Sequence, residues 1–200
     1  MSDAQSSLMA ANHKGELAAM RRSARAARAA MHPEQRASAS AKIADTVVRS
    51  PWFRRSRYIG CYLPMPDEVD TWPLIGRAWR MKKRIFVPVI EKKFVMRFRE
   101  LTADSDLRVN KFGIFEPECG ASIETRALDI VITPVVAFDK KHHRLGMGGG
   151  YYDRAFSFLK DRKQLFHPKL IGVAFSCQQV EKIVPNPWDI RIFRLIDESS

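Results

Sequence analysis

The chain has 200 residues, of which 46% are hydrophobic and 28% are charged, and it carries a formal net charge of +12. This size is typical of a single globular domain with a substantial core. The three cysteines are far apart and form no C-x-x-C pair, which argues against a disulfide framework or a zinc site. No apolar run approaches the roughly 18 residues of a membrane span, and no apolar signal segment is present. We therefore predict a cytoplasmic protein without a membrane partner.

The positive charge is unevenly distributed along the chain. Residues 1–57 contain eleven Lys and Arg against four Asp and Glu, a net charge of +7 that leaves +5 for the rest. Such a field favours an anionic partner, and charge alone does not choose between a nucleic acid, a nucleotide and a polycarboxylate. Because no recognised nucleic-acid motif occurs, we predict no nucleic-acid partner.

The N-terminal part of the chain is expected to be helical after a short tail. Residues 1–13 are small and polar and predict a disordered tail, whereas residues 16–31 are rich in Ala and Arg and predict a helix. At helical spacing, an apolar face of Met20, Ala24, Ala27 and Met31 adjoins a basic stripe of Arg21, Arg25 and Arg28. A stripe of this kind is more often a solvated face than a ligand site. A second helix is predicted at residues 33–49, with Pro33 in its first turn.

The middle and C-terminal parts alternate between strand and helix patterns. We predict strands at residues 58–63, 84–90, 94–98, 129–136, 170–175 and 193–196. A helix with Leu74, Ile75, Ala78 and Trp79 separates the first two, and residues 102–128 are rich in loops. This order predicts an α/β fold, with a mostly parallel sheet, helices on both faces in a Rossmann-like three-layer arrangement, and an N-terminal helical arm.

A glycine-rich segment at residues 144–154 follows an apolar run and precedes a helical pattern. Glycine lets the backbone pass close to a ligand, and the free N–H groups that open a helix attract anions, so a phosphate site is the physical expectation. The segment lacks the Lys-Ser/Thr of a Walker loop, and Tyr151 stands where a dinucleotide fingerprint has its last glycine. A tight connection that binds nothing is the alternative.

Three segments that follow predicted strands, at residues 63–70, 144–153 and 176–189, carry the remaining candidates for a site. Ligands of parallel sheets collect beyond the carboxyl ends of the strands, so we expect one shared site. Asp153 could hold Mg²⁺ against phosphates or serve as a helix cap, and Arg144 could contact phosphate or be an exposed charge. Glu68 could accept hydrogen bonds from a heterocycle or be an exposed loop charge.

Aromatic side chains accompany these charged candidates. Tyr151 and Tyr152 could stack on a ring or pack at the rim of the core, and Phe112 could offer a stacking face or pack inside. The residues themselves therefore predict an α/β enzyme that handles a nucleoside triphosphate with Mg²⁺ beside an aromatic, anionic second substrate. They leave the reaction open.

The segment Arg144-Leu-Gly-Met-Gly-Gly-Gly-Tyr-Tyr-Asp-Arg154, preceded by Pro134-Val-Val-Ala-Phe-Asp139, closely resembles the signature of the 5-formyltetrahydrofolate cyclo-ligase family. The similarity covers residues 14–198, which we take as a single domain. Its supporting motifs lie at residues 31–36, 62–71, 96–99, 112–117 and 172–175, with Gln178. The resemblance implies that ATP and Mg²⁺ drive conversion of 5-formyltetrahydrofolate to 5,10-methenyltetrahydrofolate, with release of ADP and phosphate.

The resemblance also implies roles for individual residues. The ATP-binding residues would be Arg21, Arg144, Leu145, Gly146, Met147, Gly148, Gly149, Gly150, Tyr151 and Tyr152. The folate-binding residues would be Leu63, Glu68, Phe112, Met147, Gly148, Gly149, Gly150 and Tyr151. Asp153 would hold Mg²⁺, with Asp189 as a second ligand. The surplus positive charge would suit a polyglutamylated folate, and we expect a monomer or a weak homodimer.

Three positions depart from the family pattern. Leu17 stands where the family commonly has a phosphate-binding Lys, Trp188 replaces a frequent His, and Phe193 replaces a usual Asp. These departures bear on ATP affinity and on the second metal ligand. They motivate an alternative function, a paralogue that binds folate or nucleotide with weakened turnover.

Overall fold

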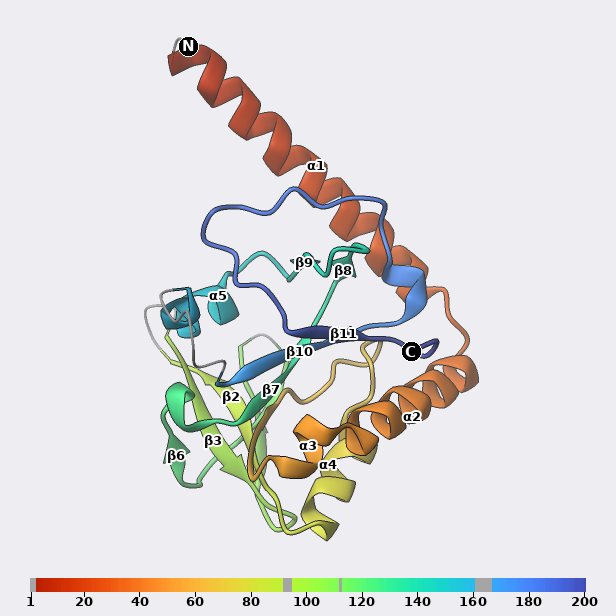
Figure 1. Cartoon of the computed structure of the whole chain (residues 1–200), viewed down its shortest axis with the longest axis vertical. Coiled ribbons are helices and arrows are strands. Elements are labelled where there is room, and N and C mark those ends of the chain that lie inside the picture. The colour runs from red at the N-terminus through yellow and green to blue at the C-terminus, as the bar shows by residue number, and fades with distance from the viewer. Residues whose placement is uncertain (1–2, 92–94, 112, 161–166) are drawn as a thin grey trace.

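The structure is a computed structural model, which describes residues 3–91, 95–111, 113–160 and 167–200 (Figure 1). Its main sheet has seven strands in the order β11-β10-β7-β1-β2-β3-β6. These strands are β1 (Tyr58–Cys61), β2 (Arg84–Ile90), β3 (Met96–Leu101), β6 (Ser122–Ile123), β7 (Ile130–Pro134), β10 (Lys169–Val173) and β11 (Arg194–Ile196). The pairs from β11 to β2 are parallel, and β3 and β6 join antiparallel at one edge. The predicted mostly parallel sheet is confirmed.

The central strands are apolar on both faces. In β1, Ile59 and Cys61 belong to the core on one side of the sheet, whereas a Cβ at Gly60 would come within 3.0 Å of Phe98 on the other. In β7, Ile130 and Ile132 share the first side and Val131 the second. This burial on both faces is what a parallel sheet covered by two layers requires.

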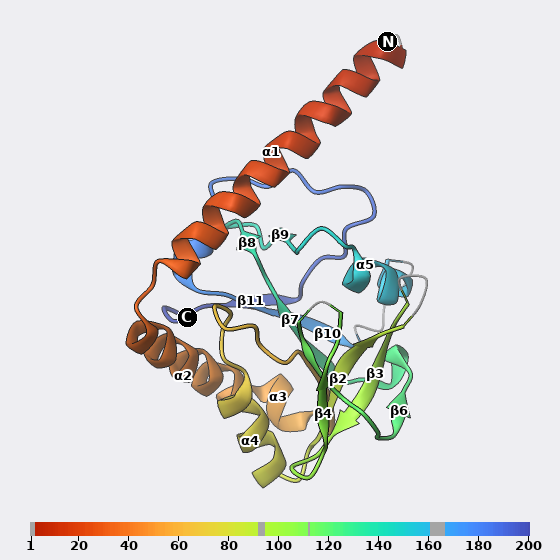
Figure 2. The same cartoon turned by 180° about the vertical axis from the view of Figure 1, so that it is seen from behind.

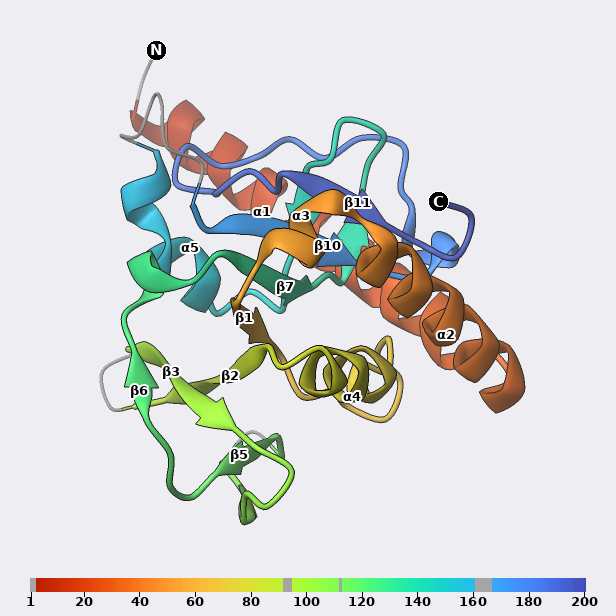
Figure 3. The ribbon, with the colours of Figure 1, turned by 60° about the horizontal axis from the view of Figure 1, so that its bottom comes forward.

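Three helices cover one face of the sheet, namely α2 (Pro33–Arg49), α3 (Pro51–Arg55) and α4 (Trp72–Arg80) (Figure 3). Each has a proline in its first turn, where the missing N–H would have no partner within the helix. Ile43 and Val47 of α2, Phe53 of α3 and Ile75 of α4 are at most 2% exposed and form one core with the sheet. The predicted helix at residues 33–49 is confirmed.

The opposite face has a thinner cover. It consists of α5 (Tyr151–Ala155), the short 3₁₀ segment η3 (Ser157–Leu159) and a C-terminal loop that contributes Ile190 and Ile192. Phe156 is fully buried at its centre, with its ring 5.9 Å from that of Phe98 and 6.2 Å from that of Tyr152. The helical pattern at residues 152–159 is therefore split into two short pieces by this buried aromatic residue.

The N-terminal arm is the single helix α1 (Asp3–Ala29), whose first turns project beyond the rest of the chain (Figures 1 and 2). This differs from the disordered tail predicted for residues 1–13, because helix formation is cooperative and extends outward from the packed half of α1. That half buries Leu17 and Ala24 in a small core with Val136, Ala137 and Leu145.

Two small hairpins stand outside the main sheet. One pairs β4 (Leu107–Val109) with β5 (Phe115–Pro117), and the other pairs β8 (Ala137–Phe138) with β9 (Arg144–Leu145). Two further 3₁₀ segments are η2 (Thr125–Ala127) and η4 (Ser176–Gln178). The β8–β9 hairpin comes after β7, and the glycines follow β9. The sequence had predicted that the glycine-rich loop follows the buried strand directly.

Candidate active site

The glycine segment turns from β9 into α5. Gly148 has φ +99° and Gly150 has φ +62°, conformations that residues with a side chain rarely adopt. Gly150 is the N-cap of α5, so the turn ends at the N–H groups that open the helix. The glycines are therefore required by the backbone path, and this path leaves peptide groups uncovered beside the start of a helix.

Arg21 of α1 reaches this turn from across the molecule. Its Nε donates to the Gly146 carbonyl oxygen at 2.8 Å. Burial lowers the pKa of Arg21, as does the nearby charge of Arg25, whereas Asp189 acts in the opposite direction. The structure thus brings together the arm, the glycine turn and the C-terminal loop, three segments that the sequence placed in one site.

Arg144 and Asp153 form a partly buried ion pair at the start of α5. Arg144 Nη2 lies 3.0 Å from Asp153 Oδ1, and their side chains are 6% and 17% exposed. The same Oδ1 accepts the backbone N–H of Ile190 at 3.1 Å. Arg144 Nε is buried without a hydrogen-bond partner among the described residues. Arg144 is thus not an exposed charge, and its unsatisfied donor marks a place for an acceptor.

The two predicted metal ligands have different surroundings. Asp189 Oδ2 accepts hydrogen bonds from Asn186, from the backbone N–H at 2.7 Å and from Nδ2 at 3.3 Å, so the side chain holds a turn. Among the residues that the structure describes, no group of three His, Cys, Asp or Glu could hold a metal ion. Mg²⁺ commonly takes one or two carboxylates together with phosphate oxygens and waters, and Asp153 with Asp189 matches that donor set.

Glu68 lies buried in the loop after β1. Its side chain is 7% exposed, and Oε2 accepts the backbone N–H of Met65 at 3.1 Å. Burial raises the pKa of Glu68, against the opposing effects of the Met65 N–H and Arg28. Glu68 is therefore not an exposed loop charge, because its carboxylate is largely shielded from solvent.

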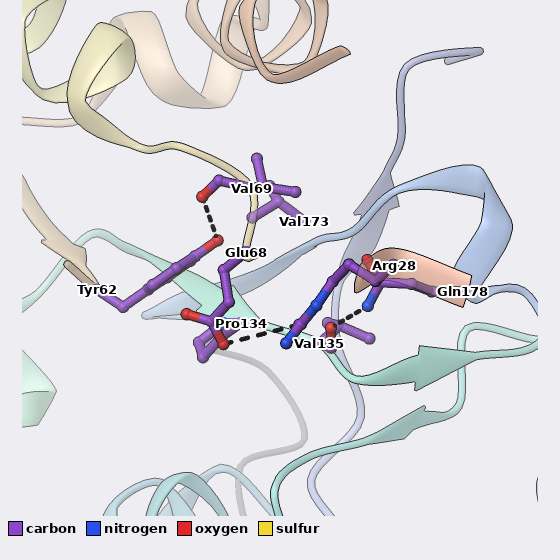
Figure 4. Close-up of a pocket in the computed structure, with 8 residues that line it drawn as sticks. All are labelled: Arg28, Tyr62, Glu68, Val69, Pro134, Val135, Val173 and Gln178. Carbon is purple, nitrogen blue, oxygen red and sulfur yellow. Dashed lines mark hydrogen bonds and ion pairs between the residues drawn. The ribbon is translucent and has the colours of Figure 1, made fainter. Parts of the chain in front are cut away.

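A closed pocket with no room for a water molecule adjoins Glu68 (Figure 4). It is lined by Arg28, Tyr62, Glu68, Val69, Pro134, Val135, Val173 and Gln178. Gln178 Nε2 donates to the carbonyls of Val135 and Val136 at 2.6 and 2.9 Å, which ties η4 to the end of β7. Sequence reasoning missed Tyr62 as a lining residue and took Arg28 as part of a solvated stripe, although Arg28 is only 5% exposed.

Tyr152 lies between the glycine turn and the Glu68 loop. Its hydroxyl is buried and has no hydrogen-bond partner among the described residues. Burial raises the pKa of Tyr152, and the nearby Cys61 and Glu68 add to this shift while Arg144 opposes it. The Tyr152 hydroxyl thus lies within electrostatic range of both Glu68 and Arg144.

The other predicted ligands differ in what they can offer. Leu63 and Leu145 are 4% and 3% exposed, so their side chains pack in the core. Met147 is 52% exposed beside the glycine turn, and Tyr151 is half-buried with Arg154 5.3 Å from its ring centroid. Phe112 lies outside the described residues.

Two of the three departures from the family pattern have a structural explanation. Leu17 is 6% exposed and packs in the core beneath α1, so it contributes to the attachment of the arm. Phe193 lies beside β11 with Lys169 Nζ 4.4 Å from its ring centroid. Trp188 is 64% exposed, and nothing in the structure explains it.

The fold and the site define an α/β protein with a glycine turn at the carboxyl ends of parallel strands, in a chain that also buries an acid in the loop after β1. A family model described as the 5-formyltetrahydrofolate cyclo-ligase family matches residues 13–198. The chain belongs to this family of ATP-dependent ligases, as its sequence predicted.

Relatives and solved structures agree with this assignment. The chain is 36% identical over 147 residues to the 5-formyltetrahydrofolate cyclo-ligase of Haemophilus influenzae, which covers 72% of this chain and 76% of the relative. It is 33% identical over 176 residues to that of Escherichia coli K12, with 86% and 94% covered. The structure of Aquifex aeolicus 5,10-methenyltetrahydrofolate synthetase superimposes with TM-score 0.78 at 30% identity, covering 92% of this chain and 90% of the other.

Proposed function

We propose that the protein converts 5-formyltetrahydrofolate to 5,10-methenyltetrahydrofolate in a reaction that consumes ATP and requires Mg²⁺. The observation that carries the proposal is the position of Tyr152 in a chain of this family. Its buried hydroxyl has no hydrogen-bond partner among the described residues and lies within electrostatic range of both Arg144 and Glu68. A nucleotide phosphate at the turn and a heterocycle at the acid would therefore be neighbours.

The chemistry explains why such neighbours are needed. A formamide oxygen is a poor leaving group, so N10 of the folate cannot displace it directly. We infer that the γ-phosphoryl group of ATP is transferred to this oxygen and ADP is released. N10 then attacks the activated carbon and loses its proton, and the C–O bond breaks as inorganic phosphate departs. In phosphoryl transfer the protein mainly positions groups and balances charge, which is what buried arginines can do.

ATP phosphates would occupy the glycine turn. The backbone N–H groups at residues 146–152 and the guanidinium groups of Arg21 and Arg144 supply donors there, and the unpaired Nε of Arg144 is one of them. Leu145 would contribute only its backbone, since its side chain is buried. Residues 147–151 would also face the folate, whereas Tyr152 would line the ATP.

The folate heterocycle would bind beside Glu68, and the side chains that line the closed pocket would have to move apart to admit it. Glu68 would accept hydrogen bonds from ring N–H groups, because one of its oxygens is not used by the protein. Leu63 would offer its backbone, since its side chain is buried, and Phe112 stays a predicted stacking partner. We also propose that the positive charge of the chain favours polyglutamylated folates over nucleic acids.

Mg²⁺ would be held by Asp153, with Asp189 as a second carboxylate. When bound, the ion would neutralise negative charge on the phosphates. Asp153 fits this role because Arg144 and the Ile190 N–H both contact one oxygen, Oδ1. The pair with Arg144 would keep this carboxylate oriented.

The setting of the enzyme is also part of the proposal. The structure gives Cys61, Cys119 and Cys177 as free thiols, which suits the reducing cytoplasm. Within the described residues, no helix is long and apolar enough to cross a membrane. We propose that the enzyme acts in the cytoplasm as a monomer or a weak homodimer.

An absorbance assay tests the activity. Folded protein mixed with 5-formyltetrahydrofolate, ATP and Mg²⁺ should generate the absorbance band of the methenyl product, and omission of ATP should abolish it. Thermal stabilisation by either ligand without any product would instead favour the binding paralogue. Salt-dependent binding of RNA or DNA, without either result, would point to a nucleic-acid protein.

A further inference from the structure

Arg28 lies buried between two carboxylates at the edge of the pocket (Figure 4). Its Nε and Nη2 donate to Oδ2 of Asp67 at 3.0 and 2.8 Å. Its third nitrogen, Nη1, lies 3.8 Å from Oε1 of Glu68, within ion-pair distance but beyond a hydrogen bond. Arg28 therefore donates hydrogen bonds to Asp67 and interacts with Glu68 only through its charge.

This arrangement leaves one carboxylate oxygen of Glu68 without a hydrogen-bond donor among the described residues. Oε2 accepts the N–H of Met65, whereas no donor among the described residues hydrogen bonds to Oε1. A carboxylate withdrawn from water needs a nearby cation to stay ionised, and Arg28 is that cation. Because Arg28 does not occupy Oε1, this oxygen can accept hydrogen bonds from a ligand.

The position of Arg28 is determined at both ends of its side chain. Its backbone belongs to α1, which Leu17 and Ala24 attach to the body through the small core. Its guanidinium is anchored by Asp67, whose side chain is 33% exposed at the rim of the pocket. The same helix presents Arg21 to the glycine turn two turns earlier, so one rigid element touches both halves of the site.

We propose that Arg28 is a positioning residue of the folate site, which holds Glu68 as an open carboxylate and thereby sets the affinity for the reduced folate. Asp67 takes part by drawing the guanidinium away from Oε1. The inference rests on the proposed function, in which Glu68 binds the heterocycle. It assigns a role in folate binding to an arginine of the N-terminal arm.

The proposal predicts opposite pH shifts for two substitutions. Glu68 is surrounded by the charged or titratable side chains of Arg25, Arg28, Asp67, Tyr62 and Tyr152. Arg28 lowers the pKa of Glu68 and Asp67 raises it. In Arg28→Met, the carboxyl group should stay protonated to higher pH, so folate binding should fail at a higher pH. In Asp67→Asn, the guanidinium is free to bond Oε1, so binding should weaken while its acid limit moves to lower pH.

The experiment measures binding of 5-formyltetrahydrofolate without ATP, by calorimetry from pH 5 to 8, together with KM for both substrates. Arg28→Met should weaken folate binding by about tenfold or more, because a buried charge partner is lost, and ATP KM should change by less than about twofold. Arg28→Lys keeps the charge and should recover part of the affinity. Arg22→Met removes the same charge from an exposed position of the same helix and is the matched control.

The outcomes separate this inference from the proposed function. Wild-type folate affinity and an unchanged pH profile in Arg28→Met, with normal turnover, would overturn the role of Arg28 alone. A wild-type protein that neither binds nor converts the folate would overturn the proposed function instead. If Arg28→Met does not fold, as circular dichroism would show, the pH shift of Asp67→Asn decides, since that variant retains the arginine. If the acid limit of folate binding does not move to lower pH in Asp67→Asn, the proposal is rejected.

Discussion

At the scale of single residues, the site depends on charges that are buried and individually paired. Arg144 pairs with Asp153, and Arg28 pairs with Asp67 beside Glu68. Removing one member of a buried pair leaves the other uncompensated, which costs more than the pair itself contributes. Substitutions at this site are therefore expected to change stability as well as activity, and paired variants are needed to separate the two effects.

Substitution of Asp153 should separate its two roles. Asp153→Ala is expected to lower kcat by about 100-fold or more and to lower the free energy of unfolding by about 2 kcal/mol, because Arg144 stays buried. Asp153→Asn keeps an acceptor for Arg144 and for the Ile190 N–H, so it should lose the same activity and less stability. Turnover and urea unfolding measure both quantities. Wild-type kcat in either variant would remove Asp153 from the mechanism.

Substitution of Arg21 should act on the nucleotide alone. Arg21→Ala is expected to raise KM for ATP by about tenfold, with little change for the folate, because the side chain lies against Gly146 of the glycine turn. Steady-state kinetics with each substrate varied in turn gives both values. Arg22→Ala, at an exposed position of the same helix, is the control. An unchanged KM for ATP would argue against the arm as a ligand.

At the scale of elements, strong periodic patterns made the sheet and its larger helices predictable. The strand at residues 84–90 and the helix at residues 33–49 have the predicted bounds, since apolar spacing and Pro33 mark them locally. The β8–β9 hairpin has strands of two residues and no period to detect. It is held by Asp139, which accepts hydrogen bonds from His143 and from the distant Ile183 N–H.

The site residues that could be predicted are marked by their neighbours along the chain, whereas the missed ones are marked only by contacts in the folded structure. The glycine segment and Glu68 could be found from the sequence because their neighbours along the chain mark them as a turn and a loop after a strand. Arg28 could not, because its partner Asp67 is 39 residues away and a helical charge stripe is normally solvated. Only tertiary contact distinguishes a buried arginine from the exposed Arg25 one turn earlier.

Two glycines in regular elements should respond oppositely to alanine. A Cβ at Gly172 of β10 would lie 2.9 Å from Ile192 and 3.0 Å from Val135, so Gly172→Ala should destabilise by about 1–3 kcal/mol. A Cβ at Gly76 of α4 would meet nothing within 4 Å, so Gly76→Ala should stabilise by about 0.5–1 kcal/mol. Urea unfolding tests both. Effects of the same sign would contradict the packing described for these elements.

At the scale of the whole molecule, the arm and the body are joined by a limited surface. The first residue of α1 in the described core is Leu17, and the N-terminal end of the helix projects beyond the body (Figure 2). The helix nevertheless reaches both the glycine turn and the Glu68 loop. Its attachment is therefore a requirement of the site more than of the sheet.

Truncation of the N-terminal helix tests whether its projecting turns contribute to stability. Deletion of residues 1–13 is expected to leave Tm within about 2 °C of the intact chain, because the buried contacts of α1 begin at Leu17. Deletion of residues 1–20 removes Leu17 and should lower Tm by more than about 4 °C. Differential scanning fluorimetry compares the two. An equal loss in both would show that the projecting turns also contribute to stability.

The contact between Arg21 and Gly146 has a consequence for biosynthesis. The two residues are 125 positions apart in the chain. A ribosome that adds roughly 5–20 residues per second needs about 6–25 s to make the second after the first. Throughout that interval the nascent helix has no partner for its apolar face. The helix therefore docks long after it has been translated, and the nucleotide site is completed only after the glycine turn has been made.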